Sequence, residues 1–387
     1  MRILQIHNSY QQAGGEDRVV EQEAELLRSH GHQVTQLTAS NDDIHGMVDR
    51  VRTAFRAAYS PRTKARCLQA IDGTQPDVAH VHNLFPLLTP SVLDACAERR
   101  IPAVMTLHNY RLLCPGAFLM RSGQVCTRCV VSTPYTAVLH RCYRGSALGS
   151  TVAARVVAAH RARGTWLVKV HRFIALTEFG RNLFIEGGLP ADRIVVKPNF
   201  CSPVPAPQED RRSGALFVGR LSKEKGVPTL LSAWRSVPHA LRIAGWGPCL
   251  TSEDPGPNVA FLGLLDPEGV AREMVKARFL VMPSEWFEGL PMVIIEAFAA
   301  GSPVLASRLG AMAEIVRDGV TGLHFEPGDP RDLATKASWL FDHPDECRQM
   351  GMNARAEYER RYTADRNYER LMDVYQQAID EARKQYA

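Results

Sequence analysis

The chain has 387 residues, of which 45% are hydrophobic and 22% are charged, proportions typical of a globular protein. No apolar run approaches the roughly 18 residues needed to cross a bilayer, which argues against a transmembrane helix. Because single hydrophobic cores stop growing well below this length, we expect two domains.

The charge is unevenly distributed along the chain. Residues 1–200 hold 24 Lys and Arg against 15 Asp and Glu, and residues 201–387 hold 22 against 26. This asymmetry suggests that the first half faces an anionic partner, such as lipid headgroups, a pyrophosphate-linked acceptor or nucleic acid; an uneven solvated surface is the alternative. The opening sequence MRILQIHNSY has no apolar signal core, so a cytoplasmic location is expected.

The first half alternates short β-branched runs with amphipathic stretches such as 16–29 and 91–98, a pattern typical of a parallel α/β sheet. The strands predicted there are 2–6, 34–37, 78–81, 103–107, 173–175 and 194–196. A second series follows, with predicted strands at 215–218, 241–244, 259–262, 279–282, 304–306 and 323–325. The fold class is therefore α/β, with two Rossmann-like doubly wound domains.

The segment 199–214 is rich in proline and poor in apolar residues, as interdomain linkers are. We place the first domain at 1–198, with a cysteine-rich insertion at about 110–145, and the second at 215–364. Residues 365–387 are predicted to form a final helix that could cross back to the first domain.

The segment 283–298 follows a predicted strand and opens a helix, the position at which open α/β sheets bind ligands. Glu288 and Glu296 are about two helical turns apart, so both carboxylates could address one elongated ligand. Gly289 permits close backbone approach, and the amides of Gly289 and Leu290 could bind anions or hydroxyls at the helix start. Alternatively, Glu288 is a helix-terminal charge and Glu296 a surface residue.

Arg220 and Lys225 follow another predicted strand and flank a turn that Gly226 closes. Arg can bind a diphosphate through its planar fork and Lys as a point charge. Either could instead be an ordinary surface cation, but together with the two carboxylates they indicate a nucleotide-sugar site.

Together, Gly-Arg-Leu-x-x-x-Lys-Gly and the Glu-(seven residues)-Glu signature resemble the retaining glycosyltransferase family 4, and the resemblance covers nearly the whole chain. The family's Gly-Gly loop matches Gly14 and Gly15. Its Thr-x-His motif, which directs a histidine at the transferred sugar, matches a segment ending at His108. Its Pro-Asn-Gly signature matches at Asn199, although Phe200 replaces the glycine. A structural histidine and a simple Gly-Gly turn are the alternatives for these residues.

The resemblance implies a GT-B fold, with two domains facing a cleft, and a catalytic set made of His108, Glu288, Arg220 and Lys225. It implies that Arg220 and Lys225 bind the donor diphosphate, that Glu288 holds hydroxyls of the transferred sugar, and that Glu296 holds the ribose. It further implies same-face substitution with retention. No Asp-x-Asp pair occurs in the chain, so we expect metal-independent transfer that needs no cofactor beyond the nucleotide-sugar donor.

Four of the nine cysteines fall in one stretch with the spacing Cys-x11-Cys-x2-Cys-x12-Cys, namely Cys114, Cys126, Cys129 and Cys142. This spacing is compatible with a structural zinc knuckle; reduced cysteines that simply pack are the alternative. A subset of family 4 enzymes of cell-surface polysaccharide synthesis looks similar here, which favours a role in shaping the acceptor site.

Residues 144–172 contain six Lys or Arg and no acidic residue, interleaved with apolar positions. Such a segment could lie on an anionic membrane, which would make the protein peripheral and favour a polyprenyl-diphosphate-linked acceptor. The alternative is a packed helix with a charged outer face.

Two other functions remain open: a nucleotide-sugar 2-epimerase of the same fold, and a non-enzymatic nucleotide-sugar sensor. No aromatic-interleaved nucleic-acid motif occurs, so no nucleic-acid partner is expected. A UDP-sugar is the preferred donor and GDP-mannose the second choice, with a glycan or lipid-linked acceptor in surface polysaccharide or O-antigen synthesis.

Overall fold

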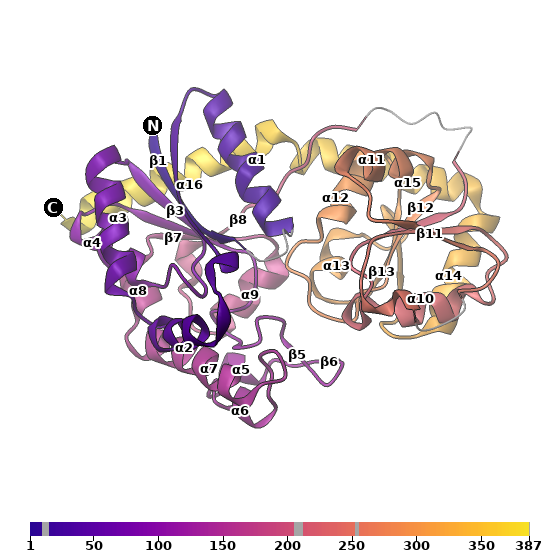
Figure 1. Ribbon diagram of the computed structural model, residues 1–387. Helices are drawn as coiled ribbons and strands as arrows, with labels where there is room; N and C mark the ends of the chain where they lie inside the picture. Colours follow the sequence, from indigo (N-terminus) through magenta and orange to yellow (C-terminus); the bar gives the residue numbers. More distant parts are fainter. Residues whose placement is uncertain (10–14, 205–211, 252–254, 387) are drawn as a thin grey trace. The chain divides into compact units, whose positions relative to one another are not determined.

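The computed structural model describes residues 1–9, 15–204, 212–251 and 255–386 (Figure 1). Contacts divide the chain into two compact units. Unit 1 comprises Met1–Arg121, Cys126–Pro198 and Asn367–Ala387, and unit 2 comprises Ser122–Val125 and Asn199–Arg366. Gly14 lies outside the described residues.

Unit 1 is built on a six-stranded parallel sheet in the order β2-β1-β3-β4-β7-β8. Its strands are β1 (Arg2–Ser9), β2 (Gln33–Ser40), β3 (Val78–Asn83), β4 (Ala103–Leu107), β7 (Arg172–Ala175) and β8 (Ile194–Val196). Its main helices are α1 (Gly15–Ser29), α2 (Gly46–Arg56), α3 (Pro61–Thr74), α4 (Ser91–Glu98), α7 (Ala147–Ala162), α8 (Thr165–Lys169), α9 (Glu178–Glu186) and α16 (Ala364–Tyr386). The insertion contains short elements: β5 (Met120–Arg121), β6 (Gln124–Val125), α5 (Arg128–Val131) and α6 (Thr136–Leu139). Of these, β6 falls within the segment assigned to unit 2.

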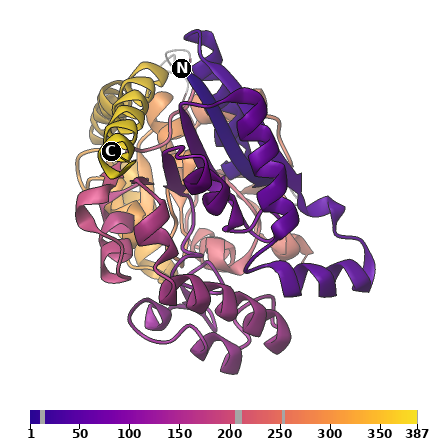
Figure 2. The same cartoon turned by 90° about the vertical axis from the view of Figure 1, so that its left-hand side faces the viewer.

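The last helix belongs to the core of unit 1. Leu371, Val374, Tyr375 and Ala378 of α16 are buried in one cluster with apolar side chains of four strands and with Leu27 of α1. Figures 1 and 2 show α16 lying along the sheet of this unit. The apolar positions recur every three or four residues, so one face of α16 is buried on the strands and the other is left to water.

Unit 2 repeats the architecture with the parallel order β11-β10-β9-β12-β13-β14. Its strands are β9 (Ala215–Val218), β10 (Leu241–Ala244), β11 (Val259–Gly263), β12 (Phe279–Met282), β13 (Val304–Ser307) and β14 (Gly322–Phe325). Its helices are α10 (Val227–Trp234), α11 (Pro267–Lys276), α12 (Met292–Ala299), α13 (Gly310–Ile315), α14 (Pro330–Asp342) and α15 (Pro344–Arg361). The prediction of two Rossmann-like parallel sheets is therefore confirmed.

Each strand order reverses direction at one place, between β1 and β3 in unit 1 and between β9 and β12 in unit 2. Ligands of doubly wound sheets bind beside such a switch point, at the carboxyl edge of the sheet. The loops singled out by sequence after β9 and β12 flank the switch point of unit 2. No helix within the described ranges is long and apolar enough to cross a membrane.

Candidate active site

In unit 2, the loops that follow β9 and β12 are in direct contact. Gly226 has φ of +70°, and a Cβ placed on it would lie 1.8 Å from the carbonyl oxygen of Pro283. The backbone amide of Glu285 donates to the carbonyl of Glu224 at 2.9 Å. Only glycine allows both the left-handed backbone and this approach. Gly226 thereby brings the Arg220–Lys225 loop against the Glu288 loop.

Glu288 is held by three donors. Its Oε1 accepts hydrogen bonds from Lys225 Nζ, Ser284 Oγ and Trp286 Nε1, each at 2.7 Å. The residue is only 6% exposed, and a buried carboxylate is stable only when it is paired and hydrogen-bonded in this way. The Lys225 ammonium also lies 5.5 Å from the Trp286 ring centroid, in cation–π range. Glu288 and Lys225 are therefore fixed in place as a pair.

Arg220 is more loosely held. Its side chain is 51% exposed and is paired with Glu224 four residues later. Exposed ion pairs of this kind contribute little to stability, so the guanidinium can exchange Glu224 for a phosphate at small cost. Lys225, with 20% side-chain exposure, is the less accessible of the two cations.

The remaining residues singled out in unit 2 lie in or just before α12, except Asn199, which begins the longer of this unit's two segments. That helix begins at Met292 with Pro291 as its N-cap, so Glu288 lies in the loop before the helix, as predicted, and Glu296 lies within the helix. Glu296 is half-buried within α12, and Leu290 is buried. Asn199 is 4% exposed, and its Oδ1 accepts no hydrogen bond from the residues described.

In unit 1, His108 directly follows β4 and contacts the neighbouring strand β3. His108 Nε2 lies 3.0 Å from His82 Nδ1, and the two rings are stacked with centroids 5.3 Å apart. Both line a cavity of about 60 Å³ together with Asn109, Arg111 and mostly apolar side chains. Burial, reinforced by the neighbouring His82, lowers the pKa of His108 well below its usual value, so the ring is neutral near pH 7. Gly15 is the first residue of α1.

Two family matches together cover most of the chain. Residues 13–203 match Glycosyltransferase Family 4, and residues 205–357 match the glycosyl transferases group 1. The chain belongs to glycosyltransferase family 4.

Individual relatives agree with the family matches. An uncharacterized glycosyltransferase of Methanocaldococcus jannaschii is 30% identical over 43% of this chain and 48% of its own length, so the chain spans about half of that relative. The phosphatidyl-myo-inositol mannosyltransferase of Mycobacterium leprae is 27% identical over 95% of this chain and 94% of its own. Among solved structures, HepE of Anabaena in complex with UDP and glucose superposes with a TM-score of 0.68 at 19% identity, covering 97% of this chain and 99% of HepE. This last similarity supports the GT-B fold.

Several residues that contact the candidate site residues, directly or through one another, were not singled out from the sequence. Ser284 and Trp286 could have been suspected from their position between β12 and Glu288. His80 and His82 are two residues apart in one strand, so both side chains point to the same face of the sheet. This spacing was a signal that we overlooked. Glu23, in the middle of an amphipathic helix, gave no signal, since its burial depends on packing against the sheet.

The four cysteines of the insertion lie near enough for their thiols to interact, but the structure does not bring three of their sulfur atoms within 4.8 Å of one another. Burial is the main cause that raises the pKa of the Cys129 and Cys142 thiols, and the other thiols of the group raise both further. Cys129 Sγ lies 3.2 Å from Thr136 Oγ1. Within the described part of the chain, the only group of three or more potential ligand atoms within 4.8 Å of one another is Glu23, His80 and His82. The zinc knuckle therefore stays a prediction.

Proposed function

We propose that this family 4 protein is a retaining glycosyltransferase that transfers a sugar from a nucleotide-sugar donor to a glycan or lipid-linked acceptor. The observation that supports this most strongly is the 2.7 Å pairing of Lys225 with a buried Glu288 beside the β9/β12 switch point. The site thus offers a cation for a diphosphate next to a carboxylate for sugar hydroxyls.

In this proposal the two cations stabilise the leaving group. Negative charge builds on the departing nucleotide diphosphate as the glycosidic bond breaks. Arg220 would give up Glu224 and bind the diphosphate through its fork, and Lys225 would share its protons between Glu288 and a phosphate oxygen. Because Glu288 is preorganised by three donors, it would hold donor hydroxyls without a reorganisation cost.

The other residues would position the donor around this centre. Glu296 would accept hydrogen bonds from the ribose hydroxyls, and the amides of Gly289 and Leu290 would face the diphosphate or the sugar. Gly14 and Gly15 would approach the phosphates, with Gly15 as the first residue of α1, and Asn199 would order the turn in which it lies. These assignments rest on the family resemblance together with the positions described above.

Retention would follow from same-face substitution, in which the leaving phosphate oxygen takes the proton of the acceptor hydroxyl. Arg220 and Lys225 supply the positive charge, and no Asp-x-Asp pair is present to chelate a metal. Transfer should therefore continue in excess chelator with an unchanged anomeric configuration. Activity that is lost on chelation and restored only by Mg²⁺ or Mn²⁺ would contradict the metal-independent mechanism.

A UDP-sugar is the preferred donor, supported by the similarity of fold to HepE, which was solved with UDP and glucose. GDP-mannose is second, because the relative from Mycobacterium leprae is named a mannosyltransferase. Calorimetric titration with UDP and GDP distinguishes these donors. Glu296→Ala and Arg220→Ala should both lower the affinity for whichever nucleotide binds. Binding of neither nucleotide would refute the donor site, and conversion of the donor sugar without an acceptor would reveal an epimerase.

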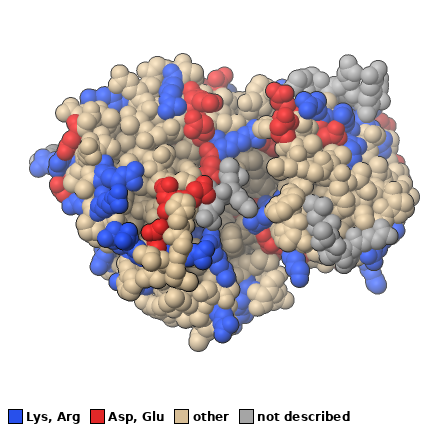
Figure 3. Space-filling view, viewed as in Figure 1, with Lys and Arg blue, Asp and Glu red and all other residues tan. Residues whose placement is uncertain are grey.

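Helix α2 supports a peripheral membrane location and hence a polyprenyl-diphosphate-linked acceptor. None of its residues is buried, and it exposes Met47, Val48, Val51 and Phe55. The same helix carries Arg50, Arg52 and Arg56. The basic segment 144–172 includes α7, which contacts α2. Figure 3 shows Lys and Arg side chains on the surface around these helices, with Asp and Glu side chains among them.

Apolar and basic residues together on an exposed helix suit an anionic bilayer surface. Cosedimentation with vesicles containing phosphatidylglycerol, but not with pure phosphatidylcholine vesicles, is the expected result, and Phe55→Ser should weaken it. Equal binding of wild type and variant would contradict the role of α2.

A further inference from the structure

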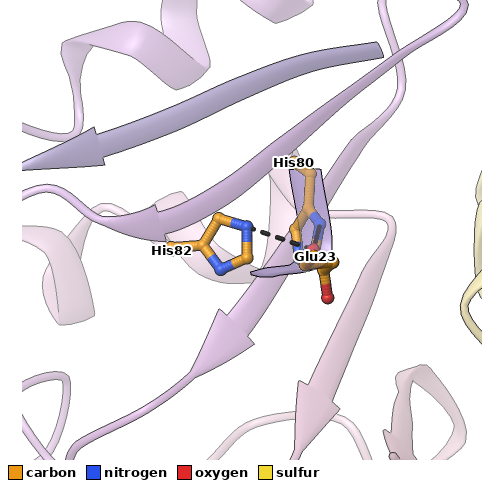
Figure 4. Close-up of side chains that lie close together, drawn as sticks. All are labelled: Glu23, His80 and His82. Atoms are coloured by element: carbon orange, nitrogen blue, oxygen red, sulfur yellow. Dashed lines mark ion pairs between the residues drawn. The ribbon is translucent and has the colours of Figure 1, made fainter. Parts of the chain in front are cut away.

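Behind His108, unit 1 contains a buried polar cluster that the proposed chemistry does not use. Glu23 of α1 and His80 and His82 of β3 are each 3% exposed or less. Figure 4 shows both imidazoles beside the Glu23 carboxylate. Glu23 Oε1 lies 3.0 Å from His80 Nδ1 and 3.4 Å from His82 Nε2. His82 in turn contacts His108 at 3.0 Å, so the cluster reaches the candidate active site.

The Glu23 carboxylate is ionised despite its burial. Burial alone would raise its pKa, but His80 and the ammonium of Lys197 lower the pKa well below the usual value. Lys197 Nζ lies 3.3 Å from Glu23 Oε2. This ammonium also argues against a metal ion at Glu23, His80 and His82, because a second cation on the same carboxylate would be repelled.

His80 and His82 differ in their partners, and of these two only His82 contacts His108. His80 is occupied on both nitrogens, by Tyr375 Oη and Glu23 at Nδ1 and by Thr106 Oγ1 at Nε2. His82 has Glu23 on one side and His108 on the other. Burial lowers the pKa of His82 to about 3, so this ring carries a single proton near pH 7.

The position of that proton follows from the charges. His82 Nε2 makes no aligned hydrogen bond within the described residues, and its neighbour is the negative Glu23 oxygen. A bare nitrogen lone pair facing a buried carboxylate would be repelled, so the proton lies on Nε2. Nδ1 of His82 is then an acceptor, and the 3.0 Å contact requires His108 to donate from Nε2. A neutral His108 is left with an unprotonated Nδ1.

We propose that Glu23, acting through His82, holds His108 in the tautomer protonated on Nε2, so that its Nδ1 accepts a hydrogen bond from a hydroxyl of the transferred sugar. Glu23 and His82 are positioning residues in this arrangement, and only His108 would touch the donor. A neutral acceptor nitrogen suits a hydroxyl and not a phosphate, so His108 would recognise the sugar and contribute no countercharge to the leaving group. The contact between His108 and the sugar is what the family resemblance implies, and it rests on the proposed function. The tautomer and the positioning roles of Glu23 and His82 are the new inference, and they rest on the contacts described above.

The tautomer can be measured without activity. In the full-length protein labelled with ¹⁵N-histidine, imidazole nitrogen shifts and couplings distinguish protonated from bare ring nitrogens, and His108→Gln assigns the signals. We expect wild-type His108 to be protonated on Nε2 at pH 7. His82→Phe removes the acceptor, and Glu23→Gln replaces the carboxylate by an amide that can donate or accept; both should abolish the single tautomer.

His80→Gln is the matched control. His80 lies in the same strand as His82, on the same face, and beside the same carboxylate, but it does not contact His108. This substitution should therefore leave the His108 tautomer unchanged. If wild-type His108 carries its proton on Nδ1, or if both His82→Phe and Glu23→Gln retain a single Nε2–H tautomer, the proposal is wrong.

Kinetics test the use of the tautomer. We expect His82→Phe to lower kcat about 10- to 100-fold, the scale for losing a partner that orients a functional histidine, with little change in KM. The double variant His82→Phe/His108→Gln should be no slower than His108→Gln, because the two residues act as one unit. Additive losses would refute the coupling. Full activity in His108→Gln, with the tautomer as expected, would instead refute the proposed role of His108 in transfer.

Discussion

Gly226 provides a sharp test of how the two donor loops are joined. A Cβ at this position would lie 1.8 Å from the carbonyl oxygen of Pro283, and the backbone has φ of +70°. The contact cannot relax by moving a flexible side chain, because the opposing atom belongs to the backbone. Gly226→Ala must therefore separate the loop after β9 from the loop after β12.

The cost has two parts. The left-handed conformation costs a residue with a Cβ about 1–2 kcal/mol. Separating the loops also weakens the 2.9 Å bond from the Glu285 amide to the Glu224 carbonyl, worth about 1 kcal/mol. Gly226→Ala should thus lower the free energy of unfolding by about 2–3 kcal/mol.

Gly263→Ala measures the cost of the left-handed backbone conformation alone. Gly263 has φ of +71°, nearly the same as Gly226, but a Cβ there meets nothing within 4 Å. Urea unfolding of both variants should show a loss about 1 kcal/mol larger for Gly226→Ala. Calorimetry should show UDP affinity lowered about tenfold, equivalent to about 1.4 kcal/mol, in Gly226→Ala alone. Equal destabilisation by the two substitutions, or unchanged UDP binding in Gly226→Ala, would refute the argument.

Three further predictions follow from the same structure. Arg220→Ala should change the melting temperature little, because its ion pair is half exposed. The same substitution should lower the affinity for UDP about tenfold or more. A large loss of stability with unchanged UDP binding would contradict this. The pKa of His82 is lowered to about 3 from about 6.5 in the unfolded chain. The neutral His82 ring therefore makes its full contribution to the free energy of unfolding above pH 6.5. This contribution is lost as the pH falls toward 3, by about 1.4 kcal/mol per pH unit. Melting temperatures measured from pH 7.5 to 4.5 should fall less steeply in His82→Phe than in wild type; parallel curves would argue against a neutral buried His82. Finally, protein purified without chelator should contain one zinc ion per chain that is lost in Cys126→Ser together with thermal stability of the insertion, and only trace zinc in wild type would leave the four thiols as packing residues.

Local pattern alone located the strands of both parallel sheets, although the predicted runs 2–6 and 34–37 end three residues before β1 and β2 do. The runs at 103–107, 215–218 and 279–282 were predicted with the limits of β4, β9 and β12 themselves, because a buried parallel strand reads as a short continuous apolar run whatever its neighbours are. The candidate ligand-binding loops could be singled out in a similar way, since glycine, charge and strand end occur within a few residues of one another.

What the sequence could not supply were relations between distant segments. Lys225 and Glu288 were singled out separately, and their contact exists because β9 and β12 are neighbours at the switch point and Gly226 permits the loops to meet. Glu23 is a helix residue like any other until α1 packs on the sheet beside His82. Strand order and the burial of single polar groups are set by long-range packing, whose free energy no local pattern contains.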